Sequence, residues 1–278
     1  MTRFIDKVAI VTGSSNGIGR GVALLFAREG AKVTITGRNA ERLEETKQEI
    51  LKTGVSPDNV NAVVADVTFE AGQDDIIGST LQKFGKINIL VNNAGGAIPD
   101  KTGAMGFDQG IDIFDKTITL NIRSIVELTK KVTPHLASTK GEIVNISSFG
   151  SGNRASCDFS YYSMSKAALD QYTRNCAITL IERGIRVNSV SPGMVNTGAA
   201  DALGWPKEVA DKFISYMASN KSCIPAGFVA NPEDIAQIVA FLADRKASSY
   251  IVGHQLVADG GSSLVTGMGA QDLSKLMQ

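Results

Sequence analysis

The stretch KVAIVTGSSNGIG (residues 7–19) decides the fold of this chain. Residues 7–12 form a nearly continuous apolar run, which is typical of a strand buried on both faces of a parallel sheet. A turn with three glycines follows. Apolar residues then recur at the spacing of an amphipathic helix: Ile18, Val22, Leu25 and Phe26. The stretch therefore predicts a strand, a glycine turn and a helix, the opening unit of a doubly wound α/β sheet.

The same alternation of strand and helix continues along the chain. Further strands are predicted at residues 32–36, 60–65, 87–92, 142–147, 186–191 and 254–258. Helices are predicted at residues 39–52, 72–84, 111–137, 160–182 and 232–243. No linker, repeat or change of composition interrupts this order. Residues 1–278 are therefore predicted to form a single three-layer α/β/α domain around a doubly wound parallel sheet.

Composition excludes several classes of protein. The 278 residues include 28 basic and 28 acidic side chains, and this zero net charge argues against a nucleic-acid partner. The three cysteines lack a C-x-x-C spacing and the two histidines are isolated, so no metal site is expected. No apolar run approaches the roughly 18 residues that span a bilayer, and no secretory signal is visible. We expect a cytoplasmic protein without a membrane span.

The glycine turn predicts a phosphate site. Gly13, Gly17 and Gly19 leave the backbone open at the start of the predicted helix, where unpaired N–H groups favour anions. Their spacing is G-x-x-x-G-x-G rather than G-x-G-x-x-G, and the alternative is a tight turn without a ligand. The second predicted strand ends in Arg38 where NAD-binding proteins often place a carboxylate. A guanidinium suits a 2′-phosphate, so NADP(H) is preferred over NAD(H); the alternative is a solvent-exposed arginine.

Four polar side chains are the candidates for catalysis. Tyr162 and Lys166 stand one helical turn apart. A phenol titrates near pH 10, and a neighbouring ammonium would lower its pKa toward a useful range. Ser148 follows a predicted strand at the edge where ligands bind in open α/β sheets. Asn121 lies inside a predicted helix, which is an unusual place for an amide unless it bonds a specific partner.

Several motifs then occur in a fixed order: TGSSNGIG (12–19), DV (66–67), NNAG (92–95), NISS (145–148), YSMSK (162–166) and SPGMVNT (191–197). Over about residues 6–262, the chain closely resembles the single-domain, Rossmann-like short-chain dehydrogenases/reductases. The resemblance implies a catalytic tetrad. Tyr162 would exchange a proton with the substrate and Ser148 would bind the substrate oxygen. Lys166 would bind the nicotinamide ribose and lower the pKa of Tyr162, and Asn121 would hold a water that relays protons to Lys166.

The resemblance also implies the cofactor contacts. They come from the glycine turn, the ends of the second, third and fourth strands, the tetrad and the loop after the sixth strand: Gly13, Ser15, Asn16, Gly17, Ile18, Gly19, Arg38, Asn39, Asp66, Val67, Asn93, Ala94, Gly95, Tyr162, Lys166, Pro192, Gly193, Val195 and Thr197. Many NADP-dependent relatives carry a basic residue where this chain has Asn16. The preference for NADP(H) therefore rests chiefly on Arg38.

The predicted function is hydride transfer between NADP(H) and a secondary alcohol or ketone, hydrophobic or cyclic. The alternatives are epimerase- or dehydratase-type chemistry on the same fold, and a non-catalytic NADP(H)-binding sensor. Residues 198–228 are predicted to form a lid over the substrate cleft, and residues 267–278 a short tail. As in relatives that form tetramers, the long helices at 111–137 and 160–182 predict a homotetramer, with a dimer as the alternative.

Overall fold

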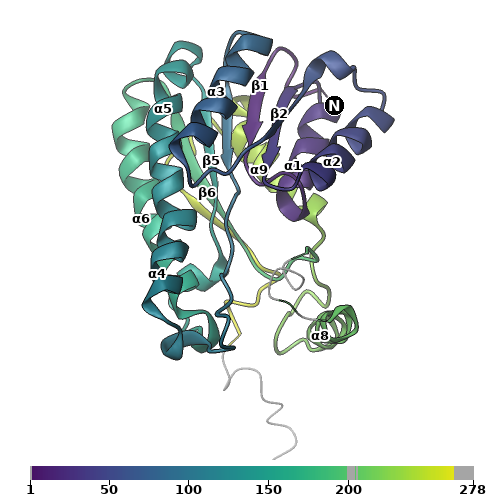
Figure 1. The fold of residues 1–278 in the computed structure, drawn as a ribbon, viewed down its shortest axis with the longest axis vertical. Coiled ribbons are helices and arrows are strands. Elements are labelled where there is room, and N and C mark those ends of the chain that lie inside the picture. Colours follow the sequence, from purple (N-terminus) through teal and green to yellow (C-terminus); the bar gives the residue numbers. More distant parts are fainter. Residues whose placement is uncertain (1, 199–203, 205, 266–278) are drawn as a thin grey trace, which may run out of the picture.

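The computed structural model describes residues 2–198, 204 and 206–265, and its centre is a parallel sheet (Figure 1). The strands are β1 (Val8–Val11), β2 (Lys32–Gly37), β3 (Val60–Val64), β4 (Ile89–Asn92), β5 (Glu142–Ile146), β6 (Arg186–Pro192) and β7 (Gln255–Ala258). Their order is β3-β2-β1-β4-β5-β6-β7, and every neighbouring pair is parallel. The predicted doubly wound fold and all of the predicted strands are confirmed.

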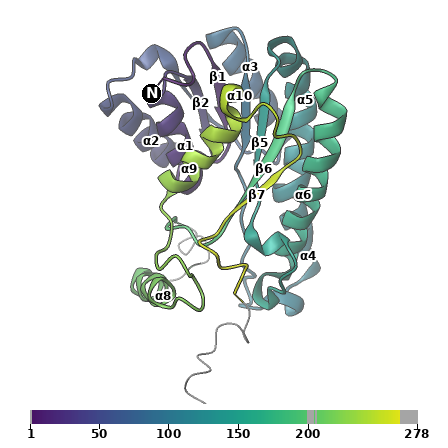
Figure 2. The ribbon, with the colours of Figure 1, turned by 180° about the vertical axis from the view of Figure 1, so that it is seen from behind.

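Helices cover both faces of the sheet (Figures 1 and 2). On one face lie α1 (Gly17–Arg28), α2 (Ala40–Lys52) and α9 (Pro232–Ala243), and on the other lie α3 (Glu70–Phe84), α5 (Ser124–Thr139) and α6 (Ser160–Ile181). Each layer has its own hydrophobic core. The neighbouring residues Ile10 and Val11 of β1 contribute to opposite cores. The strand is therefore buried on both faces, which explains its nearly continuous apolar sequence.

The helix predicted at 111–137 changes its winding in the middle. α4 (Ile111–Ile118) leads through a π-helical segment, Thr119–Arg123, into α5. The prediction of an uninterrupted α-helix is therefore wrong at this segment. A π turn inserts an extra residue into the helix, and such turns are frequent at functional sites. This turn contains Asn121, whose side chain is fully buried.

The predicted lid contains a helix that the sequence did not single out. This helix, α8 (Lys207–Ser219), lies apart from both helical layers, beyond the edge of the sheet where α1 begins (Figure 1). The chain then returns to the body, where the Ala226 N–H donates to the Gly260 carbonyl at 3.0 Å. Residues 199–203 and 205 of the predicted lid, and the predicted tail at 267–278, lie outside the described residues.

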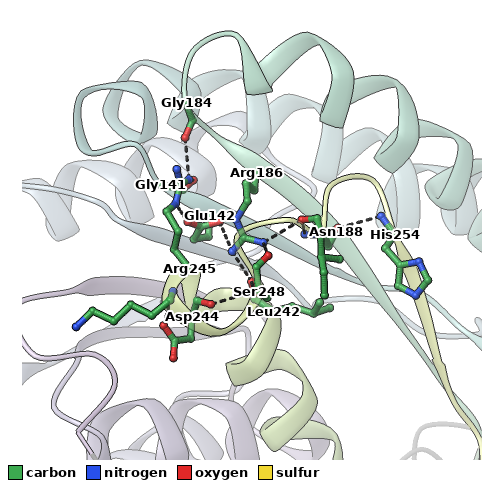
Figure 3. Close-up of polar contacts among 12 residues, drawn as sticks. Gly141, Glu142, Gly184, Arg186, Asn188, Leu242, Asp244, Arg245, Ser248 and His254 are labelled. Atoms are coloured by element: carbon green, nitrogen blue, oxygen red, sulfur yellow. Dashed lines mark hydrogen bonds and ion pairs between the residues drawn. The ribbon is translucent and has the colours of Figure 1, made fainter.

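A buried ion cluster ties together the opposite, amino-terminal edge of the sheet (Figure 3). Arg186 of β6 is 1% exposed and pairs with Glu142 Oε2 at 2.8 Å, while Arg245 Nε lies 2.5 Å from Glu142 Oε1. Arg186 also donates to three backbone carbonyls, those of Leu242, Ser248 and Ile251. Burial raises the pKa of Glu142 to about 7 despite the two guanidinium groups. The cluster joins β5 and β6 to α9 and to α10 (Arg245–Ser248).

Two kinds of feature are absent from the described residues. No helix among them is both long enough and apolar enough to cross a membrane. In the same part of the chain, no group of three or more His, Cys, Asp or Glu side chains is arranged to hold a metal ion.

Candidate active site

The predicted site residues meet at one edge of the sheet. The strand order reverses at β1, which lies between β2 and β4, and ligands bind outside the carboxyl ends of the strands at such a point. The glycine turn follows β1 and the NNAG motif (92–95) includes the end of β4. Ser148 lies just beyond β5, and α6 carries Tyr162 and Lys166 near its start. Residues that are far apart in sequence therefore gather at this edge of the sheet.

Direct contacts explain why the first turn needs its glycines. Asn93 Nδ2 donates to the carbonyls of Thr12 at 2.8 Å and Gly13 at 3.0 Å. The Thr12 hydroxyl in turn accepts the N–H groups of Asn93 and Ala94, both at 3.0 Å. Gly13 has a φ of +63°, and a Cβ there would lie 2.8 Å from Ala94 Cα. A Cβ on Gly19 would lie 2.4 Å from the Gly13 carbonyl oxygen, so the helix start packs directly against the turn.

The start of α1 has the features of an anion site. Asn16 precedes the helix, its side chain accepts the Gly17 N–H at 2.7 Å, and the first turn contains no acidic residue. A Cβ on Gly17 would lie 3.1 Å from the Thr197 side chain, so the loop after β6 lies against the helix start. A cavity of about 350 Å³ adjoins this point. Because the helix dipole favours negative charge here, the glycine turn and the start of α1 fit the phosphates of a dinucleotide.

Two charged side chains lie just beyond the carboxyl ends of β2 and β3. Arg38, beyond β2, has a side chain that is 74% exposed, and its Nη1 lies 3.8 Å from Asp66 Oδ2. Asp66 also accepts the backbone N–H of Thr68 at 2.9 Å and its hydroxyl at 2.7 Å. Asn39 uses its side chain to cap α2, and Val67 is buried in the core. Arg38 and Asp66 are therefore the charged side chains at this end of β2 and β3.

The remaining predicted cofactor residues lie near the same edge of the sheet. Ser15 contacts the end of β2, since a Cβ on Gly37 would be 2.9 Å from its hydroxyl. Ile18 packs partly buried against the core on the α1 side, and Val195 pairs with Ala230 in an isolated bridge. At the end of β6, after Pro192, the Gly193 N–H donates to the Ala258 carbonyl at 2.9 Å. A Cβ on Gly193 would lie 2.6 Å from Asp259 Cα, so the strand end needs a glycine.

Tyr162, Ser148 and Lys166 lie together. Lys166 is 2% exposed, its Nζ donates to the Ile146 carbonyl at 2.8 Å, and it lies 5.7 Å from the centre of the Tyr162 ring. Burial lowers the pKa of Lys166 to about 8. Burial also raises the pKa of Tyr162, and a hydrogen bond with the Ser148 hydroxyl acts in the opposite direction. The sequence predicted that Lys166 would lower the pKa of Tyr162. In this structure the group that acts to lower it is the Ser148 hydroxyl, and the effect of burial is larger and opposite.

Asn121 holds the loop after β4 in place. Its Nδ2 donates to the Gly96 carbonyl at 3.0 Å and to Ser165 Oγ at 2.9 Å, and its Oδ1 accepts the Gly96 N–H at 3.0 Å. A Cβ on Gly95 would lie 2.9 Å from Asn121 Oδ1 and 3.2 Å from Lys166 Nζ. Because both amide hydrogens bond protein acceptors, a water on this side chain would bind at its oxygen.

A second cavity, of about 230 Å³, lies beside Tyr162. Residues 97–100 and 103–105 of the loop after β4 form one wall. Gln109, Thr117, Asp158 and Phe159 complete the lining. The cavity combines apolar side chains with a few polar groups, which is the usual character of a small-molecule site.

Two contributors to the site were missed by the sequence reasoning. The Thr12 hydroxyl joins the ends of β1 and β4, and the Ser165 hydroxyl accepts the Asn121 amide. Thr12 is the last residue of the first predicted strand, and this position could have marked it as a site residue. Its partners lie about eighty residues away, however, so the contact itself could not be read from local sequence.

Comparisons with known proteins agree with this geometry. A protein-family model described as enoyl-(acyl carrier protein) reductase matches residues 13–263. The uncharacterized oxidoreductase YxbG of Bacillus subtilis is 35% identical over 94% of this chain and 92% of its own length. A Caenorhabditis elegans short-chain dehydrogenase/reductase of unknown function, solved with cofactor, is 62% identical with a TM-score of 0.96, covering 97% of this chain and 100% of that one. The apo-form of a C. elegans glucose dehydrogenase is also 62% identical, with a TM-score of 0.83 and coverage of 95% and 100%.

Proposed function

Because this chain belongs to the short-chain dehydrogenase/reductase family, we propose that it transfers a hydride between NADP(H) and a secondary alcohol or ketone. The observation that carries the proposal is the meeting of Ser148, Tyr162 and Lys166 beside a cavity of about 230 Å³. A hydrogen-bonded phenol beside a buried ammonium is suited to exchanging a proton with a substrate oxygen. Asn121 supports this group by fixing the backbone next to Lys166.

In the direction of reduction, the chain's own residues handle the substrate oxygen and the proton. When bound, NADPH would supply the hydride that the carbonyl carbon accepts. Tyr162 gives its phenolic proton to the carbonyl oxygen, so that C=O becomes CH–OH. Ser148 donates a hydrogen bond to the same oxygen while negative charge develops on it. Lys166 stabilises the phenolate that Tyr162 leaves behind, and in the direction of oxidation this phenolate takes the proton back.

Arg38 supports NADP(H) over NAD(H). It stands at the end of β2, and its contact with Asp66 at 3.8 Å is longer than a hydrogen bond. Such a loosely held guanidinium is available to a 2′-phosphate, which it can bind through two N–H donors. Asn16 adds no charge at the turn, so the preference depends on Arg38.

The cavity beside Tyr162 supports a compact cyclic substrate. Ile98, Met105 and Phe159 give it apolar walls, and Gln109 and Asp158 add polar groups. Polar groups at fixed positions orient a substrate that carries further hydroxyls or oxygens. The similarity to the nematode glucose dehydrogenase agrees with a hydroxylated ring. The segment 198–228 would cover this side of the cleft as a lid.

The test is a panel of cyclic and acyclic ketones and alcohols, each assayed with NADPH and with NADH. We expect turnover of secondary alcohols or ketones, with a higher kcat/KM for NADPH. Substrate conversion without any net change in nicotinamide absorbance would instead support epimerase- or dehydratase-type chemistry. Tight cofactor binding without turnover of any compound would support the non-catalytic sensor.

The proposed assembly is a homotetramer that uses the outer faces of α5 and α6. On α6 the apolar side chains of Met164, Ile178 and Ile181 are exposed. Contact between copies would remove this surface from water. Sedimentation of the purified protein distinguishes the tetramer from a dimer, and a monomer would contradict the proposal.

A further inference from the structure

A buried carboxylate lies one helical turn beyond Lys166, and the proposed mechanism does not use it. This carboxylate is Asp170, which is 6% exposed. Residues four apart in a helix lie on the same side, so Asp170 and Lys166 share a face of α6. Thr173, three residues further on, accepts a hydrogen bond from Asn145 Nδ2 of β5 at 2.9 Å. Since Lys166 and Thr173 both contact β5 or its end, Asp170 lies between them and faces the sheet.

The sheet beneath this part of α6 carries a row of neutral polar side chains. Asn145 of β5, Ser189 of β6 and Gln255 of β7 are aligned in register across neighbouring strands. In this region Asp170 Oδ1, Ser189 Oγ, Ser191 Oγ and Gln255 Nε2 are buried, and none has a hydrogen-bond partner among the described residues. On this face of the sheet, the polar side chains in and next to the Asn145 register are therefore neutral.

Ion pairing does not cancel the charge of Asp170. Of the ion pairs found between described residues, none includes this carboxylate. In a buried environment an unpaired charge acts over a longer range than it would in water, because little solvent screens it. Two basic residues, Lys166 and Arg174, stand four positions from Asp170 on α6; Arg174 is exposed and bonds Gln171, so Lys166 is the buried one. Its pKa is lowered by burial to about 8, and the Asp170 carboxylate is the charge that opposes this lowering.

The other titratable groups near this face of α6 do not supply a negative charge to Lys166. Tyr162 lies against Lys166 on the same helix. Tyr172 and Cys176 are hydrogen-bonded to one another, and Tyr172 also bonds Thr129, so they lie toward α5. Within the described part of β5, β6 and β7, the groups facing α6 here are the neutral Asn145, Ser189, Ser191 and Gln255. Asp170 thus supplies the negative charge that this interior offers to Lys166.

We infer that Asp170 is a positioning residue for the reaction: its buried carboxylate keeps the Lys166 side chain in the ammonium form while the enzyme works. Only the ammonium form can stabilise the Tyr162 phenolate. The effect of Asp170 on the reaction rests on the proposed function, whereas the electrostatic coupling between Asp170 and Lys166 does not. One measurement tests the coupling, and a second tests its effect on the reaction.

The first measurement is independent of activity. A double-mutant cycle compares the unfolding free energies of the wild-type chain, Asp170→Asn, Lys166→Met and the double variant at about pH 6 and about pH 10. We expect a favourable coupling at the lower pH, where Lys166 is charged, and its loss at the higher pH, where the amine is neutral. A coupling that is absent at the lower pH, or equal at both, would overturn the inference.

The second measurement is the pH profile of kcat/KM for carbonyl reduction. Replacing Asp170 by Asn removes the charge that raises the pKa of Lys166, so Lys166 loses its proton at a lower pH. The high-pH limb should then move down by about one pH unit. Asp170→Glu keeps the charge and should leave the limb in place, as should the neutral control Thr173→Val, which breaks a buried contact on the same helix face.

An unchanged limb in Asp170→Asn would overturn the inference. If the wild-type chain reduced no carbonyl compound, the proposed function would fail, and the double-mutant cycle would still decide whether Asp170 and Lys166 are coupled.

Discussion

In the proposed function, the choice between NADP(H) and NAD(H) depends on a single exposed side chain, Arg38. Its guanidinium is 74% exposed and rests 3.8 Å from Asp66, so little in the protein competes with a phosphate for it. Its residue type and its place at a strand end are the basis of the prediction that the chain prefers NADP(H). Asp170 was not predicted, because an aspartate inside a helix ordinarily faces water. Its burial results from the packing of α6 on β6, which no local pattern reveals.

At the residue scale, Arg38→Ala should reduce the use of NADPH selectively. Charge-assisted hydrogen bonds contribute about 1.5–3 kcal/mol, so KM for NADPH should rise roughly 10- to 100-fold. KM for NADH should stay nearly constant, because NADH has no 2′-phosphate. Lys52→Ala, at the far end of α2, is the matched control for loss of a positive charge. An equal rise for both cofactors would refute the role of Arg38.

Two elements give the site its shape, and each departs from regular structure. The turn after β1 packs so closely on the 93–94 backbone that Gly13 and Gly19 have no room for a side chain. The π segment Thr119–Arg123 carries Asn121, which fixes the backbone at Gly96. The glycine turn could be predicted because glycine spacing is visible in sequence. The π segment could not, because one extra residue in a turn hardly changes the apolar pattern of a long helix.

At the element scale, Gly19→Ala should weaken both the fold and cofactor binding. The new Cβ would lie 2.4 Å from the Gly13 carbonyl and from Asn93 Nδ2, so the turn must shift. Overpacking of this kind costs about 1–3 kcal/mol of unfolding free energy. Gly78→Ala is the control, since Gly78 lies in α3 with nothing within 4 Å of its Cβ. It should stabilise the helix by about 0.5–1 kcal/mol and leave cofactor affinity unchanged. Denaturant unfolding and cofactor titration measure both effects, and equal behaviour of the two variants would contradict this explanation.

In the whole molecule, the candidate active site and the buried Glu142–Arg186–Arg245 cluster lie at opposite edges of the sheet. The site residues gather at the carboxyl ends of the strands, while Glu142, Arg186 and Arg245 lie at the opposite edge (Figure 3). The parallel sheet, its strands and its two helical layers followed from the alternating pattern, and the motifs predicted that the site lies at the carboxyl ends of the strands. The ion cluster did not, because its members are separated by up to about a hundred residues and meet only when β5, β6 and α10 assemble.

At the scale of the molecule, Arg186→Met should destabilise the fold without changing the chemistry. It would leave the Glu142 carboxylate buried beside one guanidinium and leave three backbone carbonyls without their donor. Removing one partner of a buried pair costs about 3–5 kcal/mol, which denaturant unfolding would detect. Arg123→Met, which breaks an exposed pair with Glu127, should leave the unfolding free energy nearly unchanged. A large fall in kcat of the folded Arg186→Met protein would show that the two edges are not independent.

In the proposed mechanism Tyr162 exchanges the substrate proton, and Tyr162→Phe removes the hydroxyl that would do so. This variant removes one oxygen and keeps the ring against Lys166. With a substrate from the panel, kcat should fall roughly 10²- to 10⁴-fold, while NADPH, titrated by its fluorescence, should bind with nearly unchanged affinity. Turnover close to that of the wild-type chain, with cofactor binding intact, would rule out Tyr162 as the proton donor and acceptor.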